Sequence, residues 1–549
     1  MDLTSALARA EVFLALLVLM LILTGLARRL LVPYPILLVL GGLAIAFVPG
    51  IPPIRLHPDI VFLVFLPPIL WAAAYFTSIR EFKRNLRAIG LLSIGLVLAT
   101  TLTVGYVAHA LIPGISWAAS FALGAIVSPP DAVAATAVLH RIGVPRQLLA
   151  ILEGESLVND ATALVLYRAA VAAMVSGAFS VWSTVGNFAL VAVGGTIVGL
   201  AVSWVSRHAI RRMPEVYGKI AITLLAPYVA WVAAERIHVS GVLACVAGGL
   251  YLRRHLSADV SPTVRLEARS VWELVLFALN GMIFILIGLQ LAPLSAEATR
   301  GELQDIIRWG LLITLTAVLA RFIWVPIGTY VPRLILRAIG RPERFPKPQA
   351  VFLTSWTAMR GIVTLAAALA LPLTRADGTP LPYRSEIILV SFVVIVTTLV
   401  VQGLSLKPLA RWLGLSGKEE DQEREAAEAR ARSAEAALRH LDRLANDPGW
   451  PPTVLDSVRG HYERRLRRFG PDAPLDPTCG VEHSDRLRQL RAEAHHAERR
   501  AVIDLRNRGE IGDDVVLDLE RELDVEAMRN GIGDLVFAPE PAPKGAAWQ

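Results

Sequence analysis

The stretch Glu153-Gly-Glu-Ser-Leu-Val-Asn-Asp160 places three carboxylates inside an apolar segment. Ionisable side chains in a membrane segment are costly, and they face a cavity, a partner or an ion path. Helical spacing puts Ser156 one turn before Asp160, and Glu155 one turn before Asn159, so these oxygens can converge on one side of a helix. Glu153 could instead complement the dipole at a helix N-terminus, whereas Asp160 lies too far along the run for that role.

The composition divides the chain into two parts. Of its 549 residues, 54% are hydrophobic, and the mean hydropathy of +0.52 exceeds that of ordinary soluble proteins. Apolar runs separated by short polar loops fill residues 1–412, whereas residues 413–549 are charged and polar. We therefore predict an all-α polytopic membrane domain over 1–412 and a mainly helical cytoplasmic tail over 413–549, which either regulates the domain, contacts a partner subunit or has no effect.

The apolar runs predict about thirteen transmembrane helices of about 20 residues each. They lie near residues 11–30, 33–49, 59–77, 88–111, 116–140, 147–176, 184–206, 218–236, 239–252, 270–292, 307–331, 350–373 and 386–411, and the split between 218–236 and 239–252 is the weakest. Basic residues gather in alternate loops, which predicts an N-terminus outside and a C-terminus in the cytoplasm. The net charge of +7 suits such loops better than a nucleic-acid surface.

Two of these segments are interrupted. In Ser128-Pro-Pro-Asp131 two prolines remove backbone donors in mid-segment, so the helix must break and expose carbonyls such as that of Pro130. Such a break is tolerated where it lines a cavity. The segment Trp356-Thr-Ala-Met-Arg-Gly-Ile362 holds an arginine and a glycine. The bland alternatives are a proline kink capped by Asp131 and an Arg360 that extends toward a helix end.

The positions of the interruptions suggest symmetry. If predicted helices 1–6 repeat as helices 8–13, the two interrupted segments correspond, because they are the fifth and the twelfth. Paired interruptions in matching segments indicate a transporter site between inverted repeats. We therefore predict inverted repeats with two broken helices that cross.

The oxygen-bearing residues favour a small hard cation, Na⁺ or Li⁺, as the ligand. Asp131, Asp160, Ser156 and broken-helix carbonyls would supply its ligands. Burial and a neighbouring carboxylate disfavour the charged form of a carboxylate, so a proton could compete with the cation for one site. Competition combined with alternating access is sufficient for cation/proton exchange. The permanently charged Arg360 would pair with Glu155 and hold the unwound segment in place.

Four motifs in this order resemble the bacterial Na⁺/H⁺ antiporters of the NhaP/NHE type, within the monovalent cation:proton antiporter family. They are Phe65-Leu-Pro-Pro-Ile-Leu70, Ser128-Pro-Pro-Asp-Ala-Val133, Glu153-Gly-Glu-Ser-Leu-Val-Asn-Asp-Ala-Thr162 and Met359-Arg-Gly-Ile-Val363. The resemblance covers roughly residues 10–412.

The resemblance implies a role for each matching residue. Asn159 and Asp160 match the family's Asn-Asp pair, Asp131 its acidic residue at the crossing and Ser156 its hydroxyl ligand, whereas Glu155 and Arg360 match a buried ion pair. It also implies a homodimer in the bacterial inner membrane, surrounded by lipid. The implied activity is electroneutral exchange of one cation for one proton by a secondary transporter, not an enzyme, with no cofactor besides the transported Na⁺ and H⁺.

The sequence leaves several points open. Trp71 is followed by three alanines, where many relatives carry an acidic residue at the position of Ala72, so the choice between Na⁺, Li⁺ and K⁺ is not fixed. A K⁺/H⁺ antiporter of the same fold is the nearest alternative. An intramembrane aspartyl hydrolase using Asp131 and Asp160 is remote, because that chemistry needs neither Arg360 nor a double-proline break. Arg168 is either a second buried partner or an end residue, and Glu273 and Arg321 are expected near helix ends.

Overall fold

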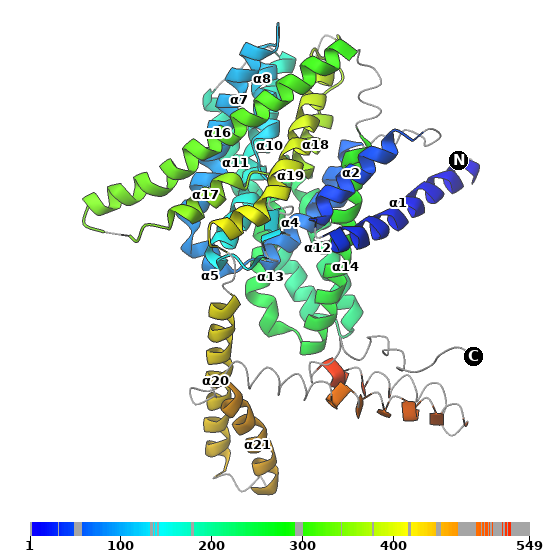
Figure 1. The fold of residues 1–549 in the computed structure, drawn as a ribbon, viewed down its shortest axis with the longest axis vertical. Helices are drawn as coiled ribbons and strands as arrows, with labels where there is room; N and C mark the ends of the chain where they lie inside the picture. Colours follow the sequence, from blue (N-terminus) through cyan, green and yellow to red (C-terminus); the bar gives the residue numbers. More distant parts are fainter. Residues whose placement is uncertain are drawn as a thin grey trace, which may run out of the picture. The chain divides into compact units, whose positions relative to one another are not determined.

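The computed structural model describes residues 3–469 apart from 31, 49–56, 132–134, 137, 140, 141, 177–180, 291–299, 342, 376, 377, 416–418 and 446–451, together with scattered residues between 490 and 528. The described residues are nearly all helical (Figure 1), and the single β-bridge among them joins Thr374 to Pro380. The chain divides into two compact units, residues 1–419 and 420–549. The all-α fold predicted from the sequence is therefore confirmed.

The first unit contains two groups of helices. The first bundle comprises α1 (Leu3–Leu30), α2 (Tyr34–Ala46), α3 (Pro58–Ile60), the π-helical turn η1 (Val61–Phe65), α4 (Leu66–Phe76), α11 (Val181–Arg212), α12 (Val216–Arg236), α13 (Gly241–Asp259) and α14 (Pro262–Leu289). Within it α13 packs against α4 and α11, and α14 packs against α2.

The second bundle carries both interrupted segments and the Glu153–Asp160 stretch, whereas the Phe65–Leu70 motif lies in the first bundle. It comprises α5 (Ile79–Arg84), α6 (Leu86–Gly90), the π-helical turn η2 (Leu91–Leu96), α7 (Val97–Leu111), α8 (Trp117–Val127), α10 (Arg146–Ser176), α16 (Arg300–Ala338), α17 (Pro348–Trp356), α18 (Ile362–Leu369) and α19 (Arg384–Trp412). Here α8 packs against α7 and α10, and α16 packs against α19 and α7. Helix α10 also contacts α4 and α13, so it lies where the two bundles meet.

Every predicted apolar segment overlaps a helix of the described chain. The weakest predicted split is present, because α12 ends at Arg236 and α13 begins at Gly241. By length and apolar composition, nine of the described helices can cross a membrane, and Tyr34–Ala46 and Trp117–Val127 are apolar but shorter. The number of crossings therefore stays a prediction.

Both interrupted segments break where the sequence indicates. Ser116 caps the start of α8 by accepting a hydrogen bond from the backbone N–H of Ala119 (3.2 Å). The helix ends at Val127, since Pro129 and Pro130 have no N–H to continue it. Helix α17 ends at Trp356 and α18 begins only at Ile362, with Thr357 already outside the helical region (φ −76°, ψ 80°).

Helix α10, by contrast, is continuous over 31 residues. It begins at Arg146, so Glu153 lies well inside the helix and the alternative of an N-terminal cap for Glu153 is wrong. The whole Glu153–Asp160 stretch therefore lies within one uninterrupted helix next to the two breaks.

The second unit contains two described helices, α20 (Glu419–Leu444) and α21 (Pro452–Phe469). An ion pair between Arg459 of α21 and Asp442 of α20 (2.7 Å) joins them. Ala434 of α20 and Leu455 of α21 are buried. A predicted helix over 481–531 falls largely outside the described residues.

The close packing of α8 against α7 depends on Gly124. A Cβ added there would overlap the backbone carbonyl oxygen of Thr101 and lie 3.2 Å from the backbone nitrogen of Gly105. We expect Gly124→Ala to reduce the free energy of unfolding by about 1–3 kcal/mol, because backbone atoms cannot move aside as side chains do. The measurement is the Tm in detergent. The control Gly25→Ala on α1, where nothing lies within 4 Å, should leave the Tm unchanged or raise it. Equal effects of both substitutions would contradict this account.

Candidate functional site: an ion cavity at two crossing helix breaks

The two unwound segments satisfy each other's backbone groups. The N–H of Asp131 donates a hydrogen bond to the carbonyl oxygen of Met359 (2.7 Å). In the opposite direction, the guanidinium of Arg360 donates from Nε to the carbonyl oxygen of Val127 (2.9 Å). Buried backbone groups without partners are costly, above all in a membrane. Each broken helix therefore supplies a hydrogen-bond partner that the other lacks at its break.

Asn159 fastens helix α10 to this crossing. Its side-chain Nδ2 donates to the carbonyl oxygen of Pro130 (2.9 Å), and the asparagine is fully buried. Pro130 was predicted to offer its carbonyl to the ion. That carbonyl accepts from Asn159, and because a carbonyl oxygen has a second lone pair, its contact with an ion stays a prediction. Asn159 thus positions the break relative to its neighbour Asp160.

Three of the predicted ligands line one cavity of about 410 Å³. Ser156 and Asp160 reach it from α10, and Asp131 reaches it from the break after α8. Asp160 is buried, with only 6% of its surface exposed. The cavity also contacts α4 and α14, so it lies between the two bundles. Its oxygens suit a hard cation.

Gly361 makes room for the Asp131 carboxylate. A Cβ added at Gly361 would overlap Oδ2 of Asp131 and lie 2.8 Å from its Cγ. Any larger residue would therefore force the carboxylate of Asp131 to move. The sequence showed this glycine only as part of an interrupted segment, and its contact with Asp131 requires the folded chain.

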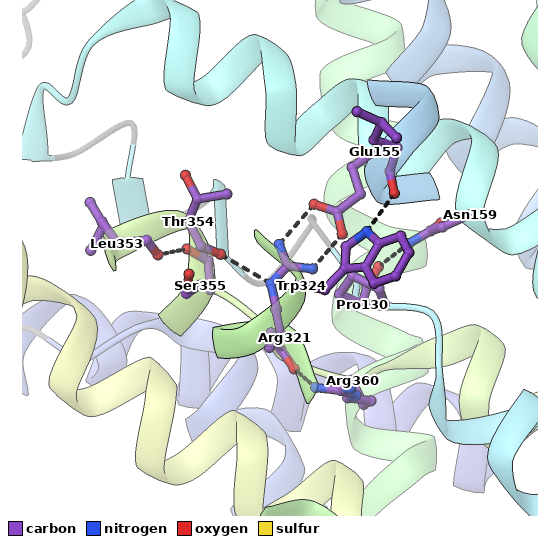
Figure 2. Close-up of polar contacts among 12 residues, drawn as sticks. Pro130, Glu155, Asn159, Arg321, Trp324, Leu353, Thr354, Ser355 and Arg360 are labelled. Carbon is purple, nitrogen blue, oxygen red and sulfur yellow. Dashed lines mark hydrogen bonds and ion pairs between the residues drawn. The ribbon is translucent and has the colours of Figure 1, made fainter. Parts of the chain in front are cut away.

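The buried ion pair differs from the sequence prediction. Glu155 pairs with Arg321 of α16, not with Arg360: Arg321 Nη2 lies 2.8 Å from Oε2, and Nη1 contacts Oε1 (Figure 2). Nε of Arg321 donates to the carbonyl oxygen of Thr354 (3.0 Å), which ties α16 and α10 to the end of α17. Arg321 lies in the middle of α16 and is 1% exposed, so its expected place near a helix end is also wrong.

The guanidinium of Arg360 binds backbone carbonyl groups instead of a carboxylate. Besides the carbonyl oxygen of Val127, the guanidinium contacts the carbonyl oxygen of Ala358. The backbone N–H of Arg360 donates to the hydroxyl of Thr398 (3.1 Å). Val127 is the last residue of α8, and its carbonyl has no partner within the helix. A cation at this end complements the negative pole of the helix dipole. Sequence reasoning identified Arg360 as important but assigned it the wrong partner.

Two further charged residues proved peripheral. Arg168 pairs with Glu235 (3.1 Å), and Arg269 pairs with Glu273 (2.8 Å); all four side chains are more than one third exposed. Ala72, where relatives often carry an acid, is buried and lines a different cavity inside the first bundle. The departure from the family pattern therefore lies outside the ion cavity.

A family model described as "Sodium/hydrogen exchanger, transmembrane" matches residues 14–412. The chain belongs to this family. It is 35% identical to a Na⁺/H⁺ exchanger of Mycobacterium tuberculosis over 92% of this chain and 93% of the relative. It is 32% identical to a sodium, potassium, lithium and rubidium/H⁺ antiporter of Bacillus subtilis over 91% of this chain and 75% of that protein.

The fold is that of the archaeal sodium proton antiporter MjNhaP1 from Methanocaldococcus jannaschii. The structures match with a TM-score of 0.58 at 23% identity, over 74% of this chain and 99% of that one. The predicted NhaP-type membership is confirmed, and the family and fold are those of transporters.

The Glu155–Arg321 pair provides a test of the corrected assignment. Arg321→Gln leaves a buried carboxylate without its countercharge, so we expect a loss of about 3–5 kcal/mol in the free energy of unfolding. Adding Glu155→Gln should recover part of that loss, because the orphaned charge is then removed. The measurement is the Tm of the two single variants and the double variant.

Arg360→Gln, alone and combined with Glu155→Gln, is the matched comparison. The double-mutant cycle of Glu155 with Arg360 should show much weaker coupling than the cycle of Glu155 with Arg321. Stronger coupling of Glu155 to Arg360 than to Arg321 would restore the sequence-based pairing.

Proposed function

We propose that the chain is a secondary antiporter that exchanges Na⁺ or Li⁺ for H⁺ across the membrane. The observation that carries this proposal is the buried Asp160 carboxylate, which shares one cavity with Asp131 and Ser156 beside two crossing helix breaks. Membership in the sodium/hydrogen exchanger family supports it. The intramembrane hydrolase alternative gains nothing from the family or the fold.

Competition for Asp160 would couple the two ions. A cation needs the charged carboxylates of Asp160 and Asp131 and the hydroxyl of Ser156, whereas a proton removes the charge from Asp160 and releases the cation. Because Asn159 cannot ionise, the Asn-Asp pair offers one exchanging carboxylate. We propose on this basis that one cation exchanges for one proton, without net charge movement.

Alternating access would arise from relative movement of the two bundles. One wall of the ion cavity comes from α4 and α14 of the first bundle, and the other comes from α10 and α18 of the second. Movement of the second bundle would carry the crossing and its ligands as one body, since hydrogen bonds join them internally.

The choice of cation has a second candidate. The Bacillus subtilis relative is named for potassium and rubidium as well as sodium and lithium, which supports a K⁺/H⁺ antiporter of the same fold. The proposed ligands, which are the carboxylates of Asp131 and Asp160 and the hydroxyl of Ser156, do not exclude the larger ion. Measured cation preference separates the two candidates.

The cellular setting is proposed on the same basis. We infer a multi-pass protein of a bacterial inner membrane, with the N-terminus outside, from the basic loops and the bacterial relatives. We further propose a homodimer, and a cytoplasmic tail that begins near residue 413.

The decisive variant is Asp160→Asn. In sealed vesicles with an imposed pH gradient, addition of Na⁺ or Li⁺ should change lumenal pH for the wild type and leave it at background for Asp160→Asn, because the amide cannot take up the exchanged proton. Glu273→Gln removes an exposed carboxylate from the same unit and should retain wild-type flux. Flux that survives in folded Asp160→Asn would overturn the proposed site. Flux with K⁺ equal to that with Na⁺ would favour the alternative, an antiporter that transports K⁺.

Gly361→Ala tests whether Asp131 contacts the cation. Displacement of its carboxylate should raise the KM for the cation about tenfold or more, since loss of one favourable contact of about 1.4 kcal/mol has that effect. Gly328→Ala on α16 is the control, because its new Cβ would meet neighbours at an ordinary 3.8 Å. An unchanged KM in active Gly361→Ala would remove Asp131 from the cation ligands.

A further inference from the structure

The hydroxyl of Thr364 is a polar group at the ion cavity that the packing of the chain does not explain. Thr364 belongs to α18, lines the cavity and is 1% exposed. Its Oγ1 is buried, and no group in the described part of the chain forms a hydrogen bond with it. A buried hydroxyl in this condition has lost its bonds to water and gained none in return, which destabilises the fold.

The break before α18 deprives this hydroxyl of its usual acceptor. Inside a helix, a threonine hydroxyl commonly donates to the carbonyl oxygen four residues earlier, as Thr354 of α17 does to Ala350 (2.8 Å). For Thr364 the residue four positions earlier is Arg360. The helix begins only at Ile362, so Arg360 lies outside it and the bond does not form. The interruption of the segment therefore leaves an oxygen available at the cavity.

Thr364 lies on the side of α18 that approaches Asp131. Gly361 and Thr364 are three residues apart, about one helical turn, so they share one side of the helix. A Cβ at Gly361 would overlap Oδ2 of Asp131, which places this side of α18 against the carboxylate. The N-terminus of a helix disfavours a cation, but the carboxylate of Asp131 lies at this end and offsets that effect. The cavity thus receives oxygen-bearing side chains from α10, from the break after α8 and from α18.

We propose that the hydroxyl oxygen of Thr364 is a further ligand of the transported cation. Hard cations prefer oxygen ligands and commonly bind about six or more of them, so Asp131, Ser156 and Asp160 leave room for others. A hydroxyl oxygen has two lone pairs that a metal ion can share. The bound cation would then join α18 to α10 and to the break after α8. This inference rests on the proposed exchange function, because it assigns another ligand to the same site.

A ligand role predicts two effects of opposite sign for Thr364→Val. Without a cation, the substitution replaces a buried hydroxyl by a methyl group of similar shape, so the variant should be at least as stable as the wild type. With a cation, the wild type gains a contact that the variant cannot make. A hydroxyl that only supported the fold would give the reverse, which is a lower Tm without the cation and an unchanged effect of the cation.

Cation binding is measured on the full chain in a neutral detergent, as the rise in Tm when Na⁺, Li⁺ or K⁺ is added at constant ionic strength. A ligand that binds only the folded state raises the Tm according to its Kd. The apparent affinity of Thr364→Val for the preferred cation should fall about fivefold, which corresponds to about 1 kcal/mol. Thr364→Ser keeps the hydroxyl and should retain most of the wild-type affinity.

Thr314→Val is the matched control. Thr314 of α16 is buried in the same bundle, does not line the ion cavity, and its hydroxyl donates to the carbonyl oxygen of Gly310 (2.7 Å). The substitution removes a buried threonine hydroxyl that has a partner within its own helix. It should therefore leave the cation-dependent rise in Tm unchanged, whatever it does to the Tm without a cation.

The other outcomes decide against Thr364 as a ligand. An unchanged affinity in Thr364→Val, or an equal loss in Thr314→Val, would leave the hydroxyl to a water molecule or to a structural role. The absence of a cation-dependent rise in the wild type would also reject the assignment. If Thr364→Val does not fold, Thr364→Ala compared with Thr364→Ser gives the same reading.

Asp160→Asn separates this inference from the proposed function. If the effect of the cation on the Tm is lost in Asp160→Asn but complete in Thr364→Val, the proposed site stands and only the role of Thr364 is rejected. If the effect survives in Asp160→Asn, the proposed site itself is rejected. Exchange is judged separately, by the flux in sealed vesicles.

Discussion

The structure depends on the requirement that backbone donors and acceptors find partners within a membrane-spanning bundle. Pro129 and Pro130 end α8 in mid-segment, and the interval between Trp356 and Ile362 interrupts the path from α17 to α18. Each break alone would leave unpaired groups in an apolar environment. Crossed, they pair with each other, Asp131 with Met359 and Arg360 with Val127. The carboxylate of Asp131 is consequently held at the break after α8, where the backbone is not helical.

Buried charge is the second requirement, and here the structure uses two arginines for different tasks. Arg321 neutralises Glu155 and joins α10 to α16 and α17. Arg360 has no carboxylate partner within the described residues and is satisfied by helix-end carbonyls. This division leaves Asp160 without an arginine contact in the described chain. An arginine partner would favour the charged carboxylate, so the absence of one fits the proposed competition between a proton and a cation at Asp160.

The arrangement into two bundles gives the two cavities different characters. The ion cavity lies between the bundles and carries carboxylates, so its shape depends on how the bundles are placed. The cavity lined by Trp71 and Trp272 lies within the first bundle and is bordered by helices that pack on one another. Only Phe76 and Leu276 are shared.

The sequence by itself determined the all-α membrane fold, the two helix breaks and the candidates Asp131, Ser156 and Asp160. It could do so because double prolines and carboxylates in apolar runs have local physical costs that few structures tolerate. The partner of Glu155 was decided only by the tertiary structure. Arg321 is 166 residues away in the chain, and an arginine in a long apolar helix looks the same in sequence whether it faces a carboxylate or approaches a helix end. The contact of Gly361 with Asp131 has the same origin, because which faces of distant segments meet depends on packing over the whole bundle.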